Sequence, residues 1–125
     1  MPLAVQIDNI ECGNDSIFVT GRLIPSGNYP AGGDTVDFTN TTASTFFTGV
    51  SAAIPSAQPP VQFGAWSQNG NLLNQFVPII GSAMNNSKLK ISAASSFGTD
   101  FGANPYSAAL LADVITFSAT FKKLQ

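Results

Sequence analysis

The chain has 125 residues, a formal net charge of −2 and only 10% charged residues, against about 25% in an ordinary soluble domain. It contains no His and one Cys, which excludes an internal disulfide, a CxxC metal site and every catalytic arrangement built on a histidine base. Its five basic residues are scattered and leave no footprint for nucleic acid or for an anionic membrane surface.

The length fits one domain, so we expect a single domain over residues 1–125. Ser, Thr, Asn, Gly and Pro together supply about two-fifths of the chain, which predicts many turns and a polar but largely uncharged surface. The first residues lack the basic and apolar regions of a signal peptide, and no run approaches the ~18 apolar residues of a membrane span. We therefore expect synthesis and folding in a cytoplasm, with no membrane and no nucleic-acid partner.

The first third of the chain predicts two strands and a long loop. Apolar residues alternate over 3–7, which indicates a half-buried strand. A turn cluster at 12–15 separates it from a second apolar stretch at 17–24, so we expect a hairpin. Pro25 ends the second strand because it has no N–H to donate, and residues 25–34 form a loop dense in Gly and Pro.

The middle of the chain predicts a strand and a hairpin. The polar, threonine-rich stretch at 37–44 indicates no particular element, whereas the more apolar residues after it predict a strand near 45–52. Apolar residues then flank Asn69-Gly70 within 61–77. Asn-Gly favours a type I′ turn, in which both central residues take positive φ, so we expect these residues to form an antiparallel hairpin.

The last third completes an all-β pattern. We expect a strand around 88–94 and a helix of at most two turns at 106–112. Apolar and polar residues alternate regularly over 114–121, which indicates a final strand. Short strands with turns every 8–12 residues are typical of sandwiches and small barrels. The predicted fold is a small antiparallel β-sandwich or β-barrel-like domain of the β-tulip type, with long loops and at most one short helix.

Two carboxylates stand close together, at Asp34 and Asp37. A glycosidase needs two carboxylates around a sugar, one of them with a raised pKa, and the sequence offers no apolar surroundings that would raise one. Side chains that accept backbone N–H groups in Asx-turns explain the pair better. We therefore expect no catalytic residue.

A second acidic cluster surrounds the first turn. Its members carry oxygen ligands of the kind that Ca²⁺ takes, but their spacing matches no EF-hand loop. They are Asp8, Asn9, Glu11, Asn14 and Asp15. A solvated turn is the better interpretation, so we expect no metal and no cofactor.

Three aromatic residues near turns and loops are candidates for a role beyond ordinary core packing. Trp66 lies next to the predicted turn, where it belongs either to the core or to an exposed platform for a ligand. Tyr29 and Tyr106 lie beside Pro in loops, a position from which an amphipathic ring commonly pins a loop onto the core.

The segment from Gly21 to Phe38 contains a strand followed by a loop of the form Gly-x-Tyr-Pro-x-Gly-Gly-Asp. This motif resembles one that recurs in small virion proteins of tailed phages. The matching positions are Gly27, Tyr29, Pro30, Gly32, Gly33, Asp34, Val36 and Asp37. The turn at 68–72 and the final Phe-rich strand are similar to the same group, although Asn71 stands where Lys is usual.

The resemblance implies a head decoration (cement) protein or related minor capsid component. Such a protein is not an enzyme: it binds the major capsid protein on the outside of the capsid and stabilises it. The resemblance further implies a homotrimer without cofactor, made in the host cytoplasm and located on the capsid surface of the virion. It places these residues in a contact loop for capsid or subunit: Tyr29, Pro30, Gly32, Gly33, Asp34 and Phe38.

The alternative function is a carbohydrate-binding β module of a tail or fibre. This hypothesis requires an exposed aromatic platform, since a planar ring offers a large, rigid and amphipathic contact surface. Trp66 is the residue that would provide it.

Overall fold

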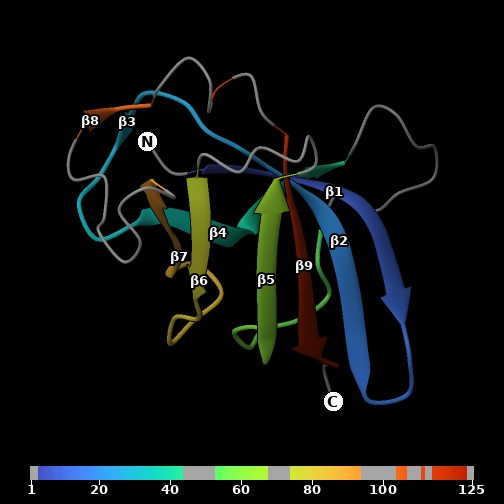
Figure 1. Ribbon diagram of the computed structural model, residues 1–125. Coiled ribbons are helices and arrows are strands. Elements are labelled where there is room, and N and C mark those ends of the chain that lie inside the picture. Colours follow the sequence, from blue (N-terminus) through green and yellow to red (C-terminus); the bar gives the residue numbers. More distant parts are fainter. Residues whose placement is uncertain are drawn as a thin grey trace.

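The structure is a computed structural model that describes residues 3–43, 53–67, 74–93, 104–106, 111 and 114–123 (Figure 1). Strands dominate this part of the chain, with turns and irregular segments between them. The strands are β1 (Leu3–Cys12), β2 (Ser16–Ile24), β3 (Asn28–Tyr29), β4 (Asp34–Ala43), β5 (Gln62–Ser67), β6 (Asn74–Ile79), β7 (Ser87–Ala93), β8 (Asn104–Pro105) and β9 (Ile115–Lys122).

Seven strands form one sheet in the order β5-β9-β2-β1-β4-β7-β6. The sheet curls until its two edge strands, β5 and β6, lie side by side, so it makes a nearly closed barrel (Figure 1). We call the line between β5 and β6 the seam. The short strands β3 and β8 pair into a second sheet at one end of the barrel. Among the described residues, the strand pairings are antiparallel except that of β1 with β4, which is parallel.

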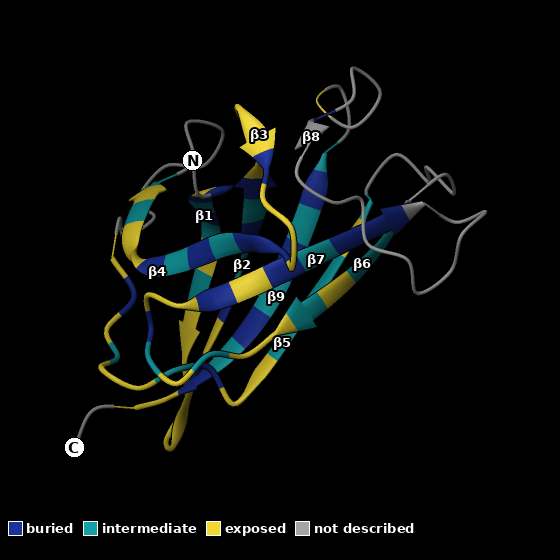
Figure 2. Cartoon of the chain, turned by 90° about the vertical axis from the view of Figure 1, so that its left-hand side faces the viewer, coloured by how far each residue is buried: buried dark blue, intermediate teal, exposed yellow. Residues whose placement is uncertain are grey.

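Alternation along the strands fills the barrel with apolar side chains. On β9 every second residue is buried, while the residues between them are half-buried or exposed (Figure 2). The rings of Phe38, Phe63, Phe117 and Phe121 meet edge to face or tilted, with centroids 5.2 to 6.4 Å apart. Because such aromatic pairs bury large areas and fix ring orientation, they tie β4, β5 and β9 into one core.

Strand β4 serves two neighbours. Residues 34–36 pair with β7, while Val36 and residues 41–43 pair with β1. Between these ladders Asp37 accepts hydrogen bonds from both the backbone N–H and the hydroxyl of Thr39. Phe38 donates its backbone N–H to the carbonyl of Met84 over 2.9 Å and buries its ring. The interruption therefore turns Phe38 into the core and shifts the register of β4 against β1, while the ladder with β7 covers only residues 34–36.

Several sequence predictions are confirmed. The chain is all-β and barrel-like, the first two strands pair as an antiparallel hairpin, and strands occupy 87–93 and 115–122. The strand predicted near 45–52 and the Asn69-Gly70 turn lie outside the described residues, as does most of the helix predicted at 106–112.

The stretch at 37–44, for which no element was predicted, contributes most of β4. The hairpin predicted within 61–77 is wrong. The described residues of β5 and β6 form no ladder with each other, because β5 pairs with β9 and β6 pairs with β7. Strong local turn chemistry within 61–77 predicts where the chain reverses, but it does not decide which strand edges pair.

The barrel wall leaves no room for a side chain at Gly21 in β2. A Cβ atom at this position would lie 2.0 Å from the backbone oxygen of Gln6 and 2.8 Å from the ring of Phe117. Gly64 in β5 is different, since a Cβ there would meet only the hydroxyl of Ser118 at 3.6 Å. The two glycines therefore form a matched pair for testing the packing.

We expect Gly21→Ala to lower the free energy of unfolding by about 3 kcal/mol, at the upper end of overpacking costs, because backbone blocks the new methyl group. Gly64→Ala should change it by less than about 1 kcal/mol. Urea unfolding followed by circular dichroism measures both. Equal stability of the two variants would contradict the register of β1, β2 and β9.

Candidate functional site

The loop at 25–34 closes on itself through a turn that needs glycine. Gly33 donates its N–H to the carbonyl of Pro30 over 3.2 Å. Gly32 has φ +90° and Gly33 has φ +117°, values that residues with a Cβ rarely adopt. A Cβ on Gly33 would also lie 3.3 Å from the carbonyl oxygen of Leu89 on β7. The Gly-Gly pair thus permits both the turn and its close approach to β7.

The side chain of Tyr29 provides a hydrogen-bond acceptor to β7 where the ladder with β4 has ended. The β4–β7 ladder ends where Asp34 pairs with Leu89, so Ile91 has no β4 partner. The hydroxyl of Tyr29 accepts the N–H of Ile91 over 3.0 Å, and both residues are fully buried. A buried amide without an acceptor would cost about 1–3 kcal/mol, and the tyrosine removes that cost.

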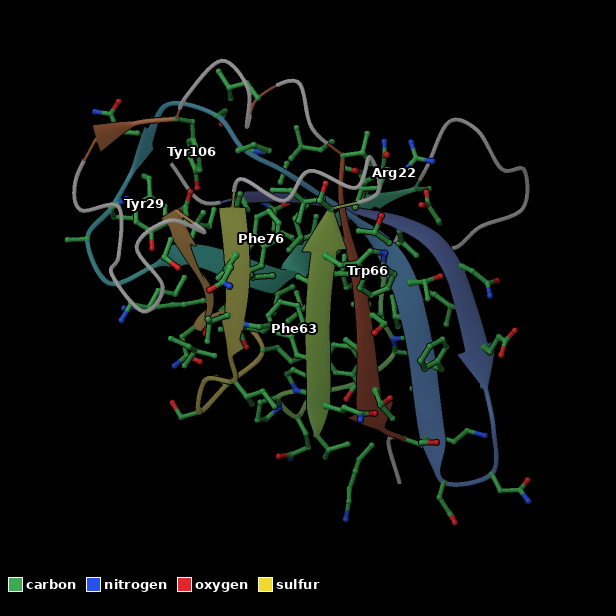
Figure 3. The ribbon with its side chains drawn as sticks, in the orientation of Figure 1. Arg22, Tyr29, Phe63, Trp66, Phe76 and Tyr106 are labelled. Atoms are coloured by element: carbon green, nitrogen blue, oxygen red, sulfur yellow. The ribbon has the colours of Figure 1, made fainter. Side chains whose placement is uncertain are left out.

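A buried acid–phenol pair lies beside Tyr29 (Figure 3). Tyr106 donates its hydroxyl to Oδ2 of Asp34 over 2.5 Å, and the N–H of Thr35 donates to Oδ1 over 2.9 Å. Burial raises the pKa of Asp34, and the two donors oppose that shift without cancelling it. Burial and the hydrogen bond to Asp34 raise the pKa of Tyr106. The rings of Tyr29 and Tyr106 meet edge to face at 5.9 Å.

These contacts decide several sequence predictions. Tyr29 and Tyr106 pin the loop onto the barrel, as predicted. The expectation that Tyr29 and Phe38 present a contact surface is wrong, because both side chains are buried. Asp34 is buried as well, and the expectation that nothing around it would raise its pKa is also wrong.

Asp37 does cap a turn, through Thr39. The loop residues left exposed lie in two stretches, 26–28 and 30–32.

Exposed apolar side chains gather on the edge strand β6 and just after it. Val77 is 50% exposed, Ile79 40% and Ile80 43%; we call these three residues the β6 strip. On β7, Lys90 lies opposite Val77 and Lys88 opposite Ile79. Sequence reasoning missed the strip because the run around Pro78 is apolar throughout and gives no sign of which side chains face outward.

Trp66 is exposed, at 47%, on the other edge strand, β5. It lies opposite Thr116 on β9, which in turn lies opposite Arg22 on β2, and Arg22 lies opposite Gln6 on β1. We call these four residues the Trp66 row. Figure 3 shows Trp66 and Arg22 toward the same end of the barrel. Nε of Arg22 lies 3.2 Å from a carboxylate oxygen of Asp8. Arg22 thus forms an ion pair with one residue of the acidic cluster noted in the sequence around the first turn.

The described residues hold no group of three or more His, Cys, Asp or Glu side chains able to bind a metal. In the same ranges no helix is long and apolar enough to cross a bilayer. Comparison with protein-family models, curated protein sequences and solved structures finds no match. The surfaces and the loop of this chain are therefore what indicate its function.

We expect Gly33→Val to lower the free energy of unfolding by about 2 kcal/mol or more, because a β-branched residue resists φ +117° and its side chain meets β7. Thermal melting measures the effect. Ala31→Ser, at an exposed position in the same turn, is the control and should leave the melting temperature within about 1 °C. An unchanged melting temperature for Gly33→Val would contradict the turn.

We expect the stability difference between wild type and Asp34→Asn to depend on pH. The raised pKa means that the folded protein holds the Asp34 proton more tightly than the unfolded chain does. Wild type should therefore lose stability relative to Asp34→Asn as the pH rises from about 3.8 through the raised pKa. Urea unfolding of both proteins from pH 3.5 to 7.5 tests this. A relative gain for wild type over that range would mean that the hydrogen bonds outweigh burial.

Proposed function

We propose that this chain is a non-enzymatic structural protein of a tailed-phage virion that binds the outside of the capsid as a homotrimer and stabilises it. The resemblance of the Gly-x-Tyr-Pro-x-Gly-Gly-Asp loop supports the virion assignment. The observation that carries the binding role is the β6 strip, an exposed apolar surface on an edge strand. The major capsid protein is the proposed partner.

The β6 strip has the chemistry of a protein contact. Three neighbouring aliphatic side chains, each at least 40% exposed, keep apolar area in water that a partner would cover. Lys88 and Lys90 lie directly opposite two of them. An apolar centre with a cationic border fits a partner surface that is apolar and edged with carboxylates.

In this proposal the loop at 25–34 contributes to capsid binding by holding one conformation before the partner arrives. Its side chains Tyr29 and Asp34 are fixed on the barrel by hydrogen bonds rather than offered to a partner. A surface held in one conformation before binding loses little conformational entropy on binding. Pro30, Ala31 and Gly32, which remain exposed at the tip, supply a backbone contact in this proposal.

The test mixes the purified protein with capsid shells assembled from the major capsid protein of the same genome. We expect saturable co-sedimentation with the shells and a higher shell melting temperature. Ile79→Lys should weaken binding by about tenfold or more, since it places a charge in the apolar centre. Val61→Lys replaces a comparably exposed apolar residue outside the strip and is the control.

Light scattering after size exclusion adds the oligomeric state. A mass of about 39 kDa, three times that of one 13.0 kDa chain, supports a trimer formed before binding. Absence of co-sedimentation would overturn the capsid assignment. Equal loss of binding in Ile79→Lys and Val61→Lys would move the contact away from the β6 strip.

A further inference from the structure

We propose that the outer face of strands β5, β9, β2 and β1 is a binding site for a neutral carbohydrate chain, with Trp66 as the ring on which a sugar stacks. This site is separate from the β6 strip, and the proposal does not depend on the virion assignment. It rests on how the sheet register arranges an exposed aromatic residue, polar uncharged side chains and a neighbouring pocket.

The Trp66 row places one aromatic residue at the end of a polar track. Thr116 follows on the next strand, then Arg22, then Gln6. Neighbouring strands lie about 4.8 Å apart, so the four residues span about 14 Å across the sheet. An extended oligosaccharide laid across the strands would meet the indole first and hydrogen-bonding side chains afterwards.

The strand that carries Trp66 leaves room beside it. Gly64 is the next residue of β5 on the same face, and its hydrogen leaves open space where a side chain would stand. Opposite it on β9 lies only the small hydroxyl of Ser118. On the Gly64 side, therefore, no side chain of β5 covers the indole of Trp66, which is 47% exposed. A flat ligand can approach it from that side.

The polar end of the row borders a pocket of about 300 Å³. Gln6 and Arg22 belong to both the row and the pocket wall. The rest of the wall is apolar: Leu23, Ile24, Pro25, Leu111, Val114 and Ile115. A concave site with an apolar lining and a few polar groups is the usual form of a small-molecule site. A sugar ring, which has apolar C–H faces and a polar hydroxyl rim, fits that combination.

The charge of this face favours an uncharged ligand. Arg22 is paired with Asp8, so the row carries no net charge from that pair. The outward residues next to the row are apolar on the pocket side, at Ala4 and Ile24. On the other side of the row they are hydroxyl or amide side chains, with Phe18 and Glu11 farther along. Those uncharged neighbours are Thr20, Ser118, Thr120 and Gln62. Side chains of this kind exchange hydrogen bonds with sugar hydroxyls and provide no electrostatic attraction for phosphate groups.

Trp66 is the single tryptophan of the chain, so intrinsic fluorescence reports on this site alone. The experiment titrates the purified full-length protein with neutral hexasaccharides of glucose, galactose and N-acetylglucosamine. We expect a saturable shift of the emission with at least one of them. Isothermal calorimetry with that sugar should show an affinity loss of about tenfold or more in Trp66→Ala.

Two variants separate a stacking platform from a structural role. Trp66→Phe keeps an aromatic ring and should retain most of the affinity that Trp66→Ala loses. Phe18→Ala, which removes another exposed ring from the same face, should bind as wild type does. Circular dichroism verifies that each variant is folded.

The proposal is overturned if none of the three sugars produces a saturable change, or if Phe18→Ala loses as much affinity as Trp66→Ala. It is also overturned if capsid shells shift the Trp66 emission while no sugar does, because the face would then belong to the capsid contact. Failure of the protein to bind shells, by contrast, leaves the sugar result unaffected and contradicts only the virion assignment.

Discussion

The ladder between β4 and β7 ends where Asp34 pairs with Leu89, and the side chain of Tyr29 continues it. Ile91, two residues farther along β7, is fully buried and has to give its N–H to an acceptor. Because the tyrosine hydroxyl is that acceptor, the chain can leave the barrel wall and form the Gly-Gly turn without orphaning a buried amide. The position of the whole loop depends on this hydrogen bond, in which the Tyr29 hydroxyl takes the place of a backbone acceptor from β4.

A second side-chain hydrogen bond next to Tyr29 accounts for the buried acid, Asp34. A carboxylate at an inward strand position has few donors, and burial alone disfavours its charged form. Tyr106 comes from 72 positions later in the chain and donates to it, while its ring packs against Tyr29. The pair therefore joins the first third of the chain to its last fifth. Its members hold the fold together and are poorly placed to meet a partner.

The sequence predicted those elements whose two faces differ in polarity. Strand β9 alternates without a break between buried Ile, Phe or Ala and outward Thr or Ser, so its period of two is plain. Strand β4 also alternates at first, but one inward position is Asp34, and around Phe38 the register against β1 shifts. A polar residue inside and an interruption in the pairing remove the periodic signal.

The candidate site was predictable only in its local part. Tyr beside Pro in a Gly-rich loop indicated a pinned loop, because that inference needs only the residue and its neighbours. The acceptor role of Tyr29 toward Ile91 and the pairing of Tyr106 with Asp34 join residues more than 60 positions apart. Their partners follow from the strand order, which no short motif of this chain specifies. The exposure of Trp66 and of the β6 strip depends on the same order.

The seam links the two proposed surfaces. Trp66 lies on β5 and the β6 strip on β6, and these edge strands run side by side (Figure 1). A capsid that approached straight onto the seam would cover the strip and the Trp66 row together. An approach from the β7 side would instead cover the strip along with Lys88 and Lys90, whose side chains flank it there. Only this second approach leaves the row from Trp66 to Gln6 open to a sugar, so the two proposals together require that the lysines, and not β5, face the capsid.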